Sequence, residues 1–343
     1  MRTNDKPTDL FAGTDNLSLD KRKFEPSQEE IERVCNFFSI GKLKYFEKEK
    51  DIIVSHSNFF IFVATTHGQF ALKFYPTDAV KTIAIEYAIN RFLISHYFPT
   101  PIMYTGQGAK PSYVSNDRLA TCFSYINGAQ VWQQIKKRNT IYQINATIVS
   151  LKNILLLTKG RIPFLKHESF TKTITTLVQT SQTISDYDQK MLIETSLQNA
   201  CQTYKSYQKL FTRQWLHNNT TLTNFLIDKN TVYTLDLSHI REDYILSDLA
   251  SLIISCLFLN IPSATIKTII KDYFYQHKMA DNFLPVLNTL ITVGLIKEYL
   301  KNIQRERTIE ISTYPQDIVR QYICQLSKHK KTIIAALKKK TIP

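Results

Sequence analysis

The sequence predicts an α+β fold in two lobes, a small β-rich part followed by a larger, mostly helical part. Runs rich in β-branched and aromatic residues are concentrated between residues 42 and 75, whereas helical spacing of apolar residues dominates from about residue 127 to 214 and again from about 245. A polar stretch, "WLHNNTTLTNFLIDKNTVYTLDLS" at 215–238, interrupts the helices and ends in a short hairpin pattern.

The domain boundaries are expected where these patterns change. We expect a disordered polar leader over residues 1–26, the β-rich lobe over 27–126, the helical lobe over 127–327 and a basic end over 328–343. The basic end carries lysines and no acids, which is typical of a solvated helix end and tail.

Composition excludes several classes of protein. No run approaches the roughly 20 apolar residues of a membrane span, and the N-terminus lacks the pattern of a signal peptide, so we expect a cytoplasmic protein. The 5 scattered cysteines contain no C-x-x-C pair and support neither a disulfide framework nor a zinc site. The net charge of +14 favours anionic partners such as nucleotides, nucleic acid or acidic lipid.

The first elements have clear patterns. "PSQEEIERVCNFF" predicts a helix with Ser27 as N-cap and Glu30 as its capping-box partner. "FFIFVATTHGQFALKFY" predicts a hairpin that turns around His67 and Gly68. In its second strand the phenylalanines alternate with Lys73, so the lysine is expected on the opposite face.

The following elements include a helix with one unusual position. Over residues 78–96, apolar residues at three-and-four spacing form one stripe, and Glu86 lies on it. A connection marked by Pro and Gly leads to short strands around 111–126 and then to the helical lobe. Within the polar stretch, a small hairpin is expected to turn at residues 228–230.

These pieces, in this order, resemble the aminoglycoside phosphotransferase superfamily, protein-kinase-like enzymes that include the type II homoserine kinases and choline kinases. The resemblance spans residues 28–327. It rests on the lysine strand "FALKFY", the helix "IAIEYAINRFL", the connection "FPTPIMYTGQG", the hinge "FSYINGAQV", the loop "LHNNTTLTNFLID" and the segment "YTLDLSHIREDYILSDLASLI". It implies a bilobal protein-kinase-like fold and transfer of phosphate from ATP, with Mg²⁺, to a small hydroxyl-bearing substrate.

The resemblance also implies roles for individual residues. Lys73 would contact the phosphates and Glu86 would pair with it, since phosphoryl transfer needs a positioned triphosphate. Asn224 and Asp236 would ligate the metal. The further residues implied are Tyr125 and Ile126 beside Ser124 at the hinge, where the backbone would bind adenine, and His217 and Asp248 as braces of the loop and the following helix.

Three departures from the family pattern concern the chemistry. The catalytic loop of the family has an Asp two residues after its His, and Asn219 occupies that place here. An amide cannot accept a proton at neutral pH, and positioned general-base catalysis typically contributes about 10²–10⁴ in rate. Thr221 stands where the family has its second loop histidine. The turn over the phosphates, "DIIVSHSNFF", has no glycine, which leaves Ser55, Ser57 and Asn58 as its candidate donors.

Alternative interpretations remain at this stage. Lys73 would otherwise be a solvent-facing strand residue, Glu86 a partly exposed helix residue and Asp236 the end of a strand. His217 is a structural hydrogen-bonding residue on either interpretation, although it belongs with Asn219 to the catalytic loop. Asp248 is expected as an acid at a helix N-terminus.

Three functions are therefore open. The first is a phosphotransferase that is slow because of Asn219. The second is an inactive pseudokinase that serves as a binding or regulatory module for a protein partner. The third, a binder of nucleic acid or of an acidic membrane surface, has only the excess positive charge in its favour.

Overall fold

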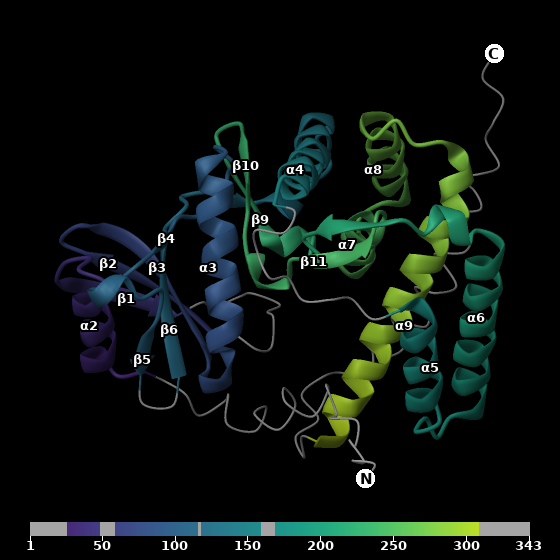
Figure 1. Cartoon of the computed structure of the whole chain (residues 1–343), viewed down its shortest axis with the longest axis horizontal. Coiled ribbons are helices and arrows are strands. Elements are labelled where there is room, and N and C mark those ends of the chain that lie inside the picture. The colour runs from purple at the N-terminus through teal and green to yellow at the C-terminus, as the bar shows by residue number, and fades with distance from the viewer. Residues whose placement is uncertain (1–25, 49–58, 116–117, 159–168, 309–343) are drawn as a thin grey trace, which may run out of the picture. The chain divides into compact units, whose positions relative to one another are not determined.

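The computed structural model describes residues 26–48, 59–115, 118–158 and 169–308 (Figure 1). Three predictions lie outside these residues: the leader up to residue 25, the phosphate-covering turn with Ser57 and Asn58, and the basic end over 328–343.

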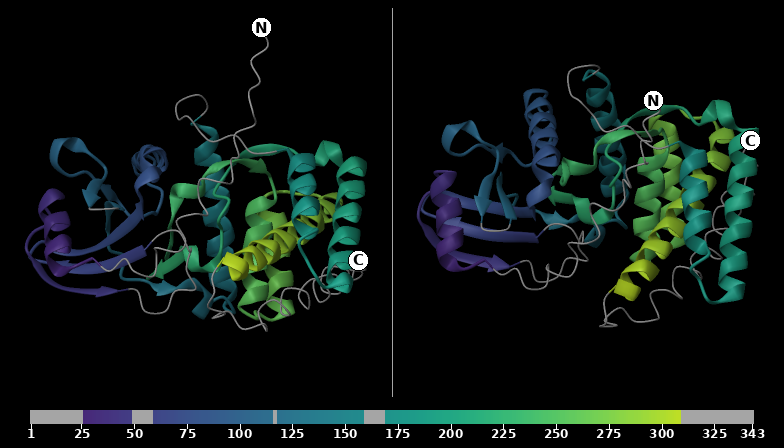
Figure 2. Two further views of the ribbon diagram at one scale, coloured as in Figure 1. Left: turned by 90° about the horizontal axis from the view of Figure 1, so that it is seen from below. Right: turned by 60° about the horizontal axis from the view of Figure 1, so that its bottom comes forward.

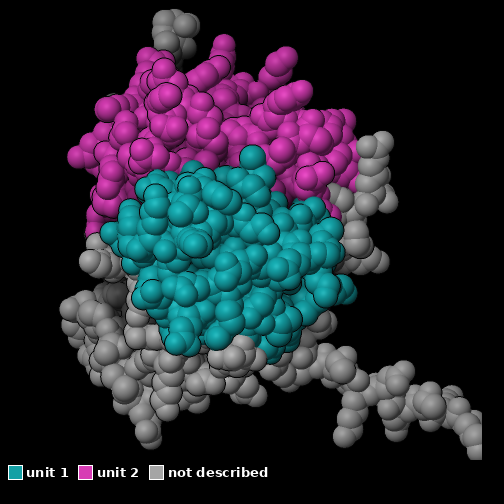
Figure 3. Space-filling model, turned by 90° about the vertical axis from the view of Figure 1, so that its left-hand side faces the viewer, with its two compact units in different colours: residues 1–87, 101–125 teal, residues 88–100, 126–343 magenta. Residues whose placement is uncertain are grey.

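The chain divides into two compact units, coloured separately in Figure 3. Unit 1 comprises residues 1–87 and 101–125, and unit 2 comprises residues 88–100 and 126–343. The predicted β-rich lobe was continuous over 27–126, whereas residues 88–100 group with unit 2. One reason is a pair of hydrogen bonds to strand β10 (Thr231–Thr234) of unit 2: Thr100 Oγ1 donates to the Thr234 carbonyl at 2.9 Å, and the Thr234 N–H donates to the Pro99 carbonyl at 3.0 Å.

Unit 1 is built on an antiparallel sheet. Its strands follow the order β1-β2-β3-β6-β4, and β5 pairs with β6. The elements are α2 (Gln28–Phe37), β1 (Leu43–Lys48), β2 (Phe59–Thr65), β3 (Gly68–Pro76), α3 (Val80–Ser95), which continues into unit 2, β4 (Met103–Tyr104), β5 (Tyr113–Ser115) and β6 (Arg118–Ser124). The first helix begins as predicted, since the Ser27 hydroxyl accepts the Glu30 N–H at 3.2 Å.

The β2–β3 hairpin confirms the predicted alternation. Thr65 pairs with Gly68 across the turn. One face of β3 presents Phe70, Leu72 and Phe74, which pack in a cluster with residues of α2. The other face carries Lys73, whose side chain is 1% exposed, and α3 covers it with the buried Glu86 stripe. Both faces of this strand are therefore buried, and the solvent-facing interpretation of Lys73 is wrong.

Unit 2 is mostly helical with two small sheets. Its elements are α4 (Arg138–Leu156), α5 (Phe170–Ser181), α6 (Tyr187–Ser206), α7 (Ser247–Phe258), α8 (Ser263–Gln276) and α9 (Leu284–Thr308), with β7 (Ala129–Gln130), β8 (Arg213–Leu216), β9 (Phe225–Asp228), β10 (Thr231–Thr234) and β11 (Arg241–Tyr244). The sheets have the orders β10-β9-β7 and β11-β8. The β9–β10 hairpin is the predicted one, whereas β8 and β11 were not predicted.

Short 3₁₀ segments connect these elements in both units. They are η1 (Thr77–Ala79), η2 (Gln107–Ala109), η3 (Val131–Gln133), η4 (Gln208–Leu210), η5 (Leu222–Asn224), η6 (Leu237–His239) and η7 (Asp281–Phe283). Two of them, η5 and η6, lie in the polar stretch that the sequence singled out.

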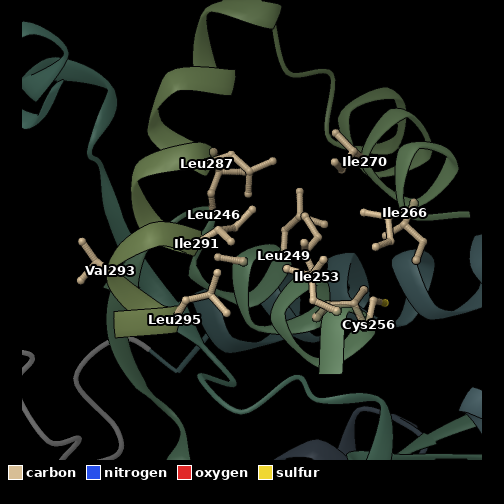
Figure 4. Packing of buried hydrophobic residues seen from close by; sticks show 14 of the residues in the cluster. Leu246, Leu249, Ile253, Cys256, Ile266, Ile270, Leu287, Ile291, Val293 and Leu295 are labelled. Carbon is tan, nitrogen blue, oxygen red and sulfur yellow. The ribbon is translucent and has the colours of Figure 1, made fainter. Parts of the chain in front are cut away.

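The core of unit 2 forms around α7 (Figure 4). Leu249, Ile253 and Cys256 of α7 are buried with side chains of α8 and α9, among them Ile266 and Leu287. Helices α5 and α6 contact α9 and run alongside it in Figures 1 and 2. Helix α9 thus contacts α5, α6 and α7, and α7 packs against both α8 and α9.

The long helix α9 differs from one expectation. The stretch Asp281–Lys301 is, by length and composition, apolar enough to cross a membrane, although the sequence was expected to hold no such run. Half of its most apolar window is buried inside the unit, and its residues Val286, Ile291 and Leu295 are fully buried in the core. Its apolar character is thus accounted for by packing.

Gly41 lies just before β1, the first strand of the sheet in unit 1. Gly41 has φ +94°, and a Cβ built there would lie 2.5 Å from Thr66 Oγ1 and 3.0 Å from the His67 backbone nitrogen. We expect Gly41→Ala to lower the free energy of unfolding by about 2–4 kcal/mol, because backbone strain and overpacking add. Urea denaturation measures the effect.

The matched control is Gly108→Ala. Gly108 also has positive φ, +67°, but a Cβ there would meet only the Lys110 side chain at 4.0 Å. It should cost about 1 kcal/mol, the strain alone. Equal losses in the two variants would contradict the crowding at Gly41.

Candidate active site

The predicted phosphate-binding lysine and its acid lie together in unit 1. Lys73 Nζ is 3.3 Å from Glu86 Oε1, and both side chains are 1% exposed. The strand alternation places Lys73 beneath α3, and the stripe of α3 turns Glu86 toward it. Removing one member of such a buried pair typically costs about 3–5 kcal/mol, because the other charge is left uncompensated.

A tyrosine extends this charge cluster. The Tyr75 hydroxyl donates to Glu86 Oε2, and Lys73 Nζ lies 4.6 Å from the centroid of the Tyr75 ring. Tyr75 is 2% exposed and two positions after Lys73 on the same face of β3. Sequence reasoning noted the alternation and missed the hydroxyl contact.

The predicted adenine hinge begins at the end of β6. The Ile102 N–H donates to Ser124 Oγ at 2.8 Å, which fixes the strand end. The Tyr125 ring lies edge-on to Phe62, with centroids 5.6 Å apart, beside a cavity of about 80 Å³ lined also by Tyr45 and Gln69. Ile126 belongs to unit 2, so binding of adenine by the backbone of Tyr125 and Ile126 stays a prediction.

In unit 2, the loop after β8 is held by one carboxylate. Asp248 Oδ2 accepts the His217 N–H at 3.2 Å, and its Oδ1 accepts the Asn218 N–H at 2.8 Å. Thr220 Oγ1 donates to the Asp248 carbonyl at 2.5 Å. Asp248 does lie in the first turn of α7, as predicted, but its carboxylate binds the loop backbone.

Asn218 turns the chain at this point. Its φ is +61°, a left-handed conformation that Asn tolerates better than most residues. Its Nδ2 donates to the carbonyls of Leu216 and Arg241 at 3.2 and 3.0 Å, which joins the loop to β8 and β11. The sequence signal that would have found Asn218 is the Asn-Asn pair itself, because Asn is common in turns and tolerates the left-handed conformation.

His217 is fully buried, and both of its ring nitrogens are engaged. Nδ1 accepts the Asn219 N–H at 3.2 Å, while Nε2 lies 2.9 Å from the Leu235 carbonyl, which can only accept. These partners require the neutral tautomer with its hydrogen on Nε2. His217 thus positions the loop against the hairpin.

The predicted metal ligands and Asn219 meet in one cluster. Asn219 Nδ2 donates to Asp236 Oδ2 at 3.3 Å, and Asn224 Nδ2 donates to the Asn219 carbonyl at 2.7 Å. The backbone closes the cluster, because the Leu235 N–H donates to the Asn224 carbonyl at 2.9 Å. The three polar side chains that the sequence singled out here are therefore neighbours.

Asp236 has two further neighbours that sequence reasoning missed. The Ser238 hydroxyl donates to Oδ1 at 2.6 Å, and His239 Nε2 lies 3.6 Å from Oδ2. Asp236 itself has φ +54°, a left-handed conformation at the start of η6. Its carboxylate is thus oriented from several sides.

The residue types fit a magnesium ion. Because Nδ2 of Asn224 faces the Asn219 carbonyl, its amide oxygen is the end available to a cation, and Asp236 supplies a carboxylate. Mg²⁺ is commonly bound through one or two carboxylates together with phosphate and water oxygens. Among the residues that the structure describes, no group of three or more His, Cys, Asp or Glu could hold a metal ion.

The burial of Asp248 has an electrostatic consequence. Loss of solvation raises the pKa of its carboxyl from 3.8 to about 7, against the opposing effect of the two backbone N–H donors. The proton therefore binds more tightly in the folded state than in the unfolded chain.

The fold is that of known phosphotransferases. No family model and no curated protein matches the sequence. Among solved structures, an amicoumacin kinase in complex with AMP-PNP and Ca²⁺ has a TM-score of 0.68 at 13% identity, covering 93% of this chain and 95% of that one. A spectinomycin phosphotransferase in complex with ADP and spectinomycin has 0.63 at 12% identity, covering 91% and 99%.

A choline kinase from Cryptosporidium parvum is similar as well, with a TM-score of 0.60 at 14% identity, covering 91% of this chain and 97% of that one. The chain therefore has the α+β bilobal, protein-kinase-like fold of the aminoglycoside phosphotransferases and choline kinases. At the level of the fold, the resemblance read from the sequence is confirmed.

The contacts of Asp248 predict the effect of its removal. We expect Asp248→Asn to lower the free energy of unfolding by about 1–3 kcal/mol at pH 5, because both oxygens of the protonated carboxyl can still accept a backbone N–H, whereas the NH₂ group of an amide cannot. Asp186→Asn is the control, since Asp186 caps α6 by accepting the Gln189 N–H at 2.9 Å and Asn caps equally well. A loss no larger than that of the control would contradict the stabilisation of the loop by the Asp248 carboxyl group.

Asp248 also predicts a pH dependence. Its folded pKa of about 7 exceeds the unfolded value of 3.8, so its stabilising contribution is present below about pH 4 and is lost as the pH rises through 7. Urea denaturation between pH 5 and pH 8 should show a steeper fall of stability in the wild type than in Asp248→Asn. Equal slopes would rule out this titration.

The Asn219–Asp236 contact predicts a dependence on divalent cations. In Asn219→Asp a second carboxylate would lie about as close to Asp236 Oδ2 as the amide does, 3.3 Å. In EDTA we expect a loss of about 1–2 kcal/mol from repulsion, regained with millimolar Mg²⁺. Denaturation of Asn199→Asp, an exposed site on α6, should not depend on Mg²⁺; the same behaviour in both variants would contradict the contact.

Proposed function

We propose that this chain is an ATP- and Mg²⁺-dependent phosphotransferase that acts on a small hydroxyl compound in the cytoplasm. The observation that carries the proposal is the Lys73–Glu86 pair, with an Nζ–Oε1 distance of 3.3 Å and 1% exposure of each side chain. Burying an ion pair contributes little to stability by itself, which favours a functional reason for it. Similar folds bind AMP-PNP and ADP, which supports the use of a nucleotide.

Each of these residues has a defined task in this proposal. The Lys73 ammonium supplies a positive charge for the triphosphate, and Glu86 holds it in place. Asn224, through its amide oxygen, and Asp236 would hold Mg²⁺, which when bound neutralises charge on the phosphates. Ser238, which donates to Asp236 Oδ1, keeps that carboxylate oriented.

Asn219 would orient the acceptor hydroxyl. Its side-chain Nδ2 faces Asp236, so its side-chain oxygen, Oδ1, is the end left to accept a hydrogen bond from a substrate. This oxygen cannot remove the proton. In most analyses phosphoryl transfer has a loose transition state, so a hydroxyl that is only oriented can still accept the phosphate. The rate would be lower by the factor of about 10²–10⁴ that a general base typically contributes.

A second candidate function has a specific observation in its favour. The Asn219 amide satisfies the Asp236 carboxylate, and His217 is fixed in a neutral tautomer by two partners. The loop thus keeps its shape without a group able to take up the substrate proton. A pseudokinase that binds nucleotide and acts as a regulatory module would use the same arrangement.

The proposal predicts a response to ATP. With Mg²⁺, nucleotide at a hundred times its Kd should add about 2.7 kcal/mol to the free energy of unfolding, seen as a rise in Tm in a thermal titration. The rise should be smaller without Mg²⁺ and in Lys73→Met. Lys205→Met, at an exposed position in the last turn of α6, is the control and should respond as the wild type does.

The outcomes separate the two candidate functions. A flat response of the wild type would reject nucleotide binding and with it the phosphotransferase. Stabilisation by ATP without consumption of ATP, over a panel of small alcohols, would favour the pseudokinase.

A further inference from the structure

Glu86 is held through both of its carboxylate oxygens. Lys73 Nζ is 3.3 Å from Oε1, and the Tyr75 hydroxyl donates to Oε2. Both partners come from one strand, β3, and from one face of it. Donors on different oxygens of one carboxylate restrict its rotation about the last side-chain torsion more than a single donor does.

Packing explains the ring of Tyr75 but not its hydroxyl. The ring is buried in a cluster with Ile83 of α3, Met103 of β4 and Leu119 of β6, which a phenylalanine would fill as well. The hydroxyl lies in a region without solvent, where an unbonded polar group would be costly, and it bonds to the acid that pairs with Lys73. The ring also lies against the ammonium, 4.6 Å from centroid to Nζ.

We propose that Tyr75 is a positioning residue for nucleotide binding: its hydroxyl fixes the Glu86 carboxylate, which in turn holds the Lys73 ammonium toward the phosphates. This inference rests on the proposed function, because it concerns the same lysine. The inference adds Tyr75 as a second residue of β3, beside Lys73, that donates to the Glu86 carboxylate.

The test is Tyr75→Phe, which keeps the ring. Calorimetric titration with ATP and Mg²⁺ should show a Kd raised about fivefold to twentyfold, which is only part of the worth of a hydrogen bond to a charged group, because the bond also exists in the ATP-free protein. Tyr299→Phe is the matched control, because Tyr299 is 1% exposed and its hydroxyl donates to Gln189 Oε1 at 2.5 Å within unit 2. Its Kd for ATP should equal that of the wild type.

A double-mutant cycle distinguishes positioning from packing. In a Glu86→Met background the side-chain volume is kept and the carboxylate is lost, so Tyr75→Phe should change the Kd for ATP by less than about twofold. An equal rise in both backgrounds would mean that Tyr75 acts through packing alone and would overturn the inference, as would an unchanged Kd in Tyr75→Phe.

Failure of the proposed function has a different signature. If the wild type and Tyr299→Phe both fail to bind ATP, the phosphotransferase and the role of Tyr75 fall together. If both bind ATP and Tyr75→Phe binds it equally well, only the role of Tyr75 is lost.

Discussion

The loop after β8 depends on the carboxyl group of Asp248, which accepts two consecutive backbone N–H groups at 3.2 and 2.8 Å. These bonds fix the backbone of His217 and Asn218, and thereby the positions of the His217 ring and of Asn219. The His217 ring joins the loop to the hairpin end at Leu235, and the next residue is Asn219. A buried carboxylate at the start of α7 thus sets the direction of a loop 30 residues earlier in the chain.

Unit 1 uses a buried carboxylate in a similar way. Glu86 accepts from Lys73 and Tyr75 on a strand, where Asp248 accepts from the backbone of a loop. In both cases an acid on a helix is removed from water, and the cost of desolvation is offset by donors that another element supplies. Lys73 contacts Glu86, and Asn219 directly follows the two residues that Asp248 holds, so these parts of the candidate site depend on polar interactions that also stabilise the fold.

Local periodicity explains what could be predicted. The alternation around Lys73 predicts the face of the strand on which it lies, and the helical stripe predicts the face of the helix on which Glu86 lies. These two faces pack against each other, which buries both side chains. Strands β8 and β11 are as short as β9 and β10, but they lie far apart in the chain and lack the tight turn that marks the β9–β10 hairpin in the sequence. The Tyr75 hydroxyl and the Asp248 carboxylate make contacts that depend on tertiary packing, which a pattern in one segment does not contain.

The backbone at Asp236 has an evolutionary consequence. Its φ of +54° is a conformation that Gly, Asn and Asp adopt more readily than other residues. Two of these three carry a side-chain oxygen, so most substitutions that delete the oxygen also strain the chain. Selection for a well-folded hairpin therefore also favours a side-chain oxygen at this position beside Asn219, whether or not that oxygen has any task in chemistry.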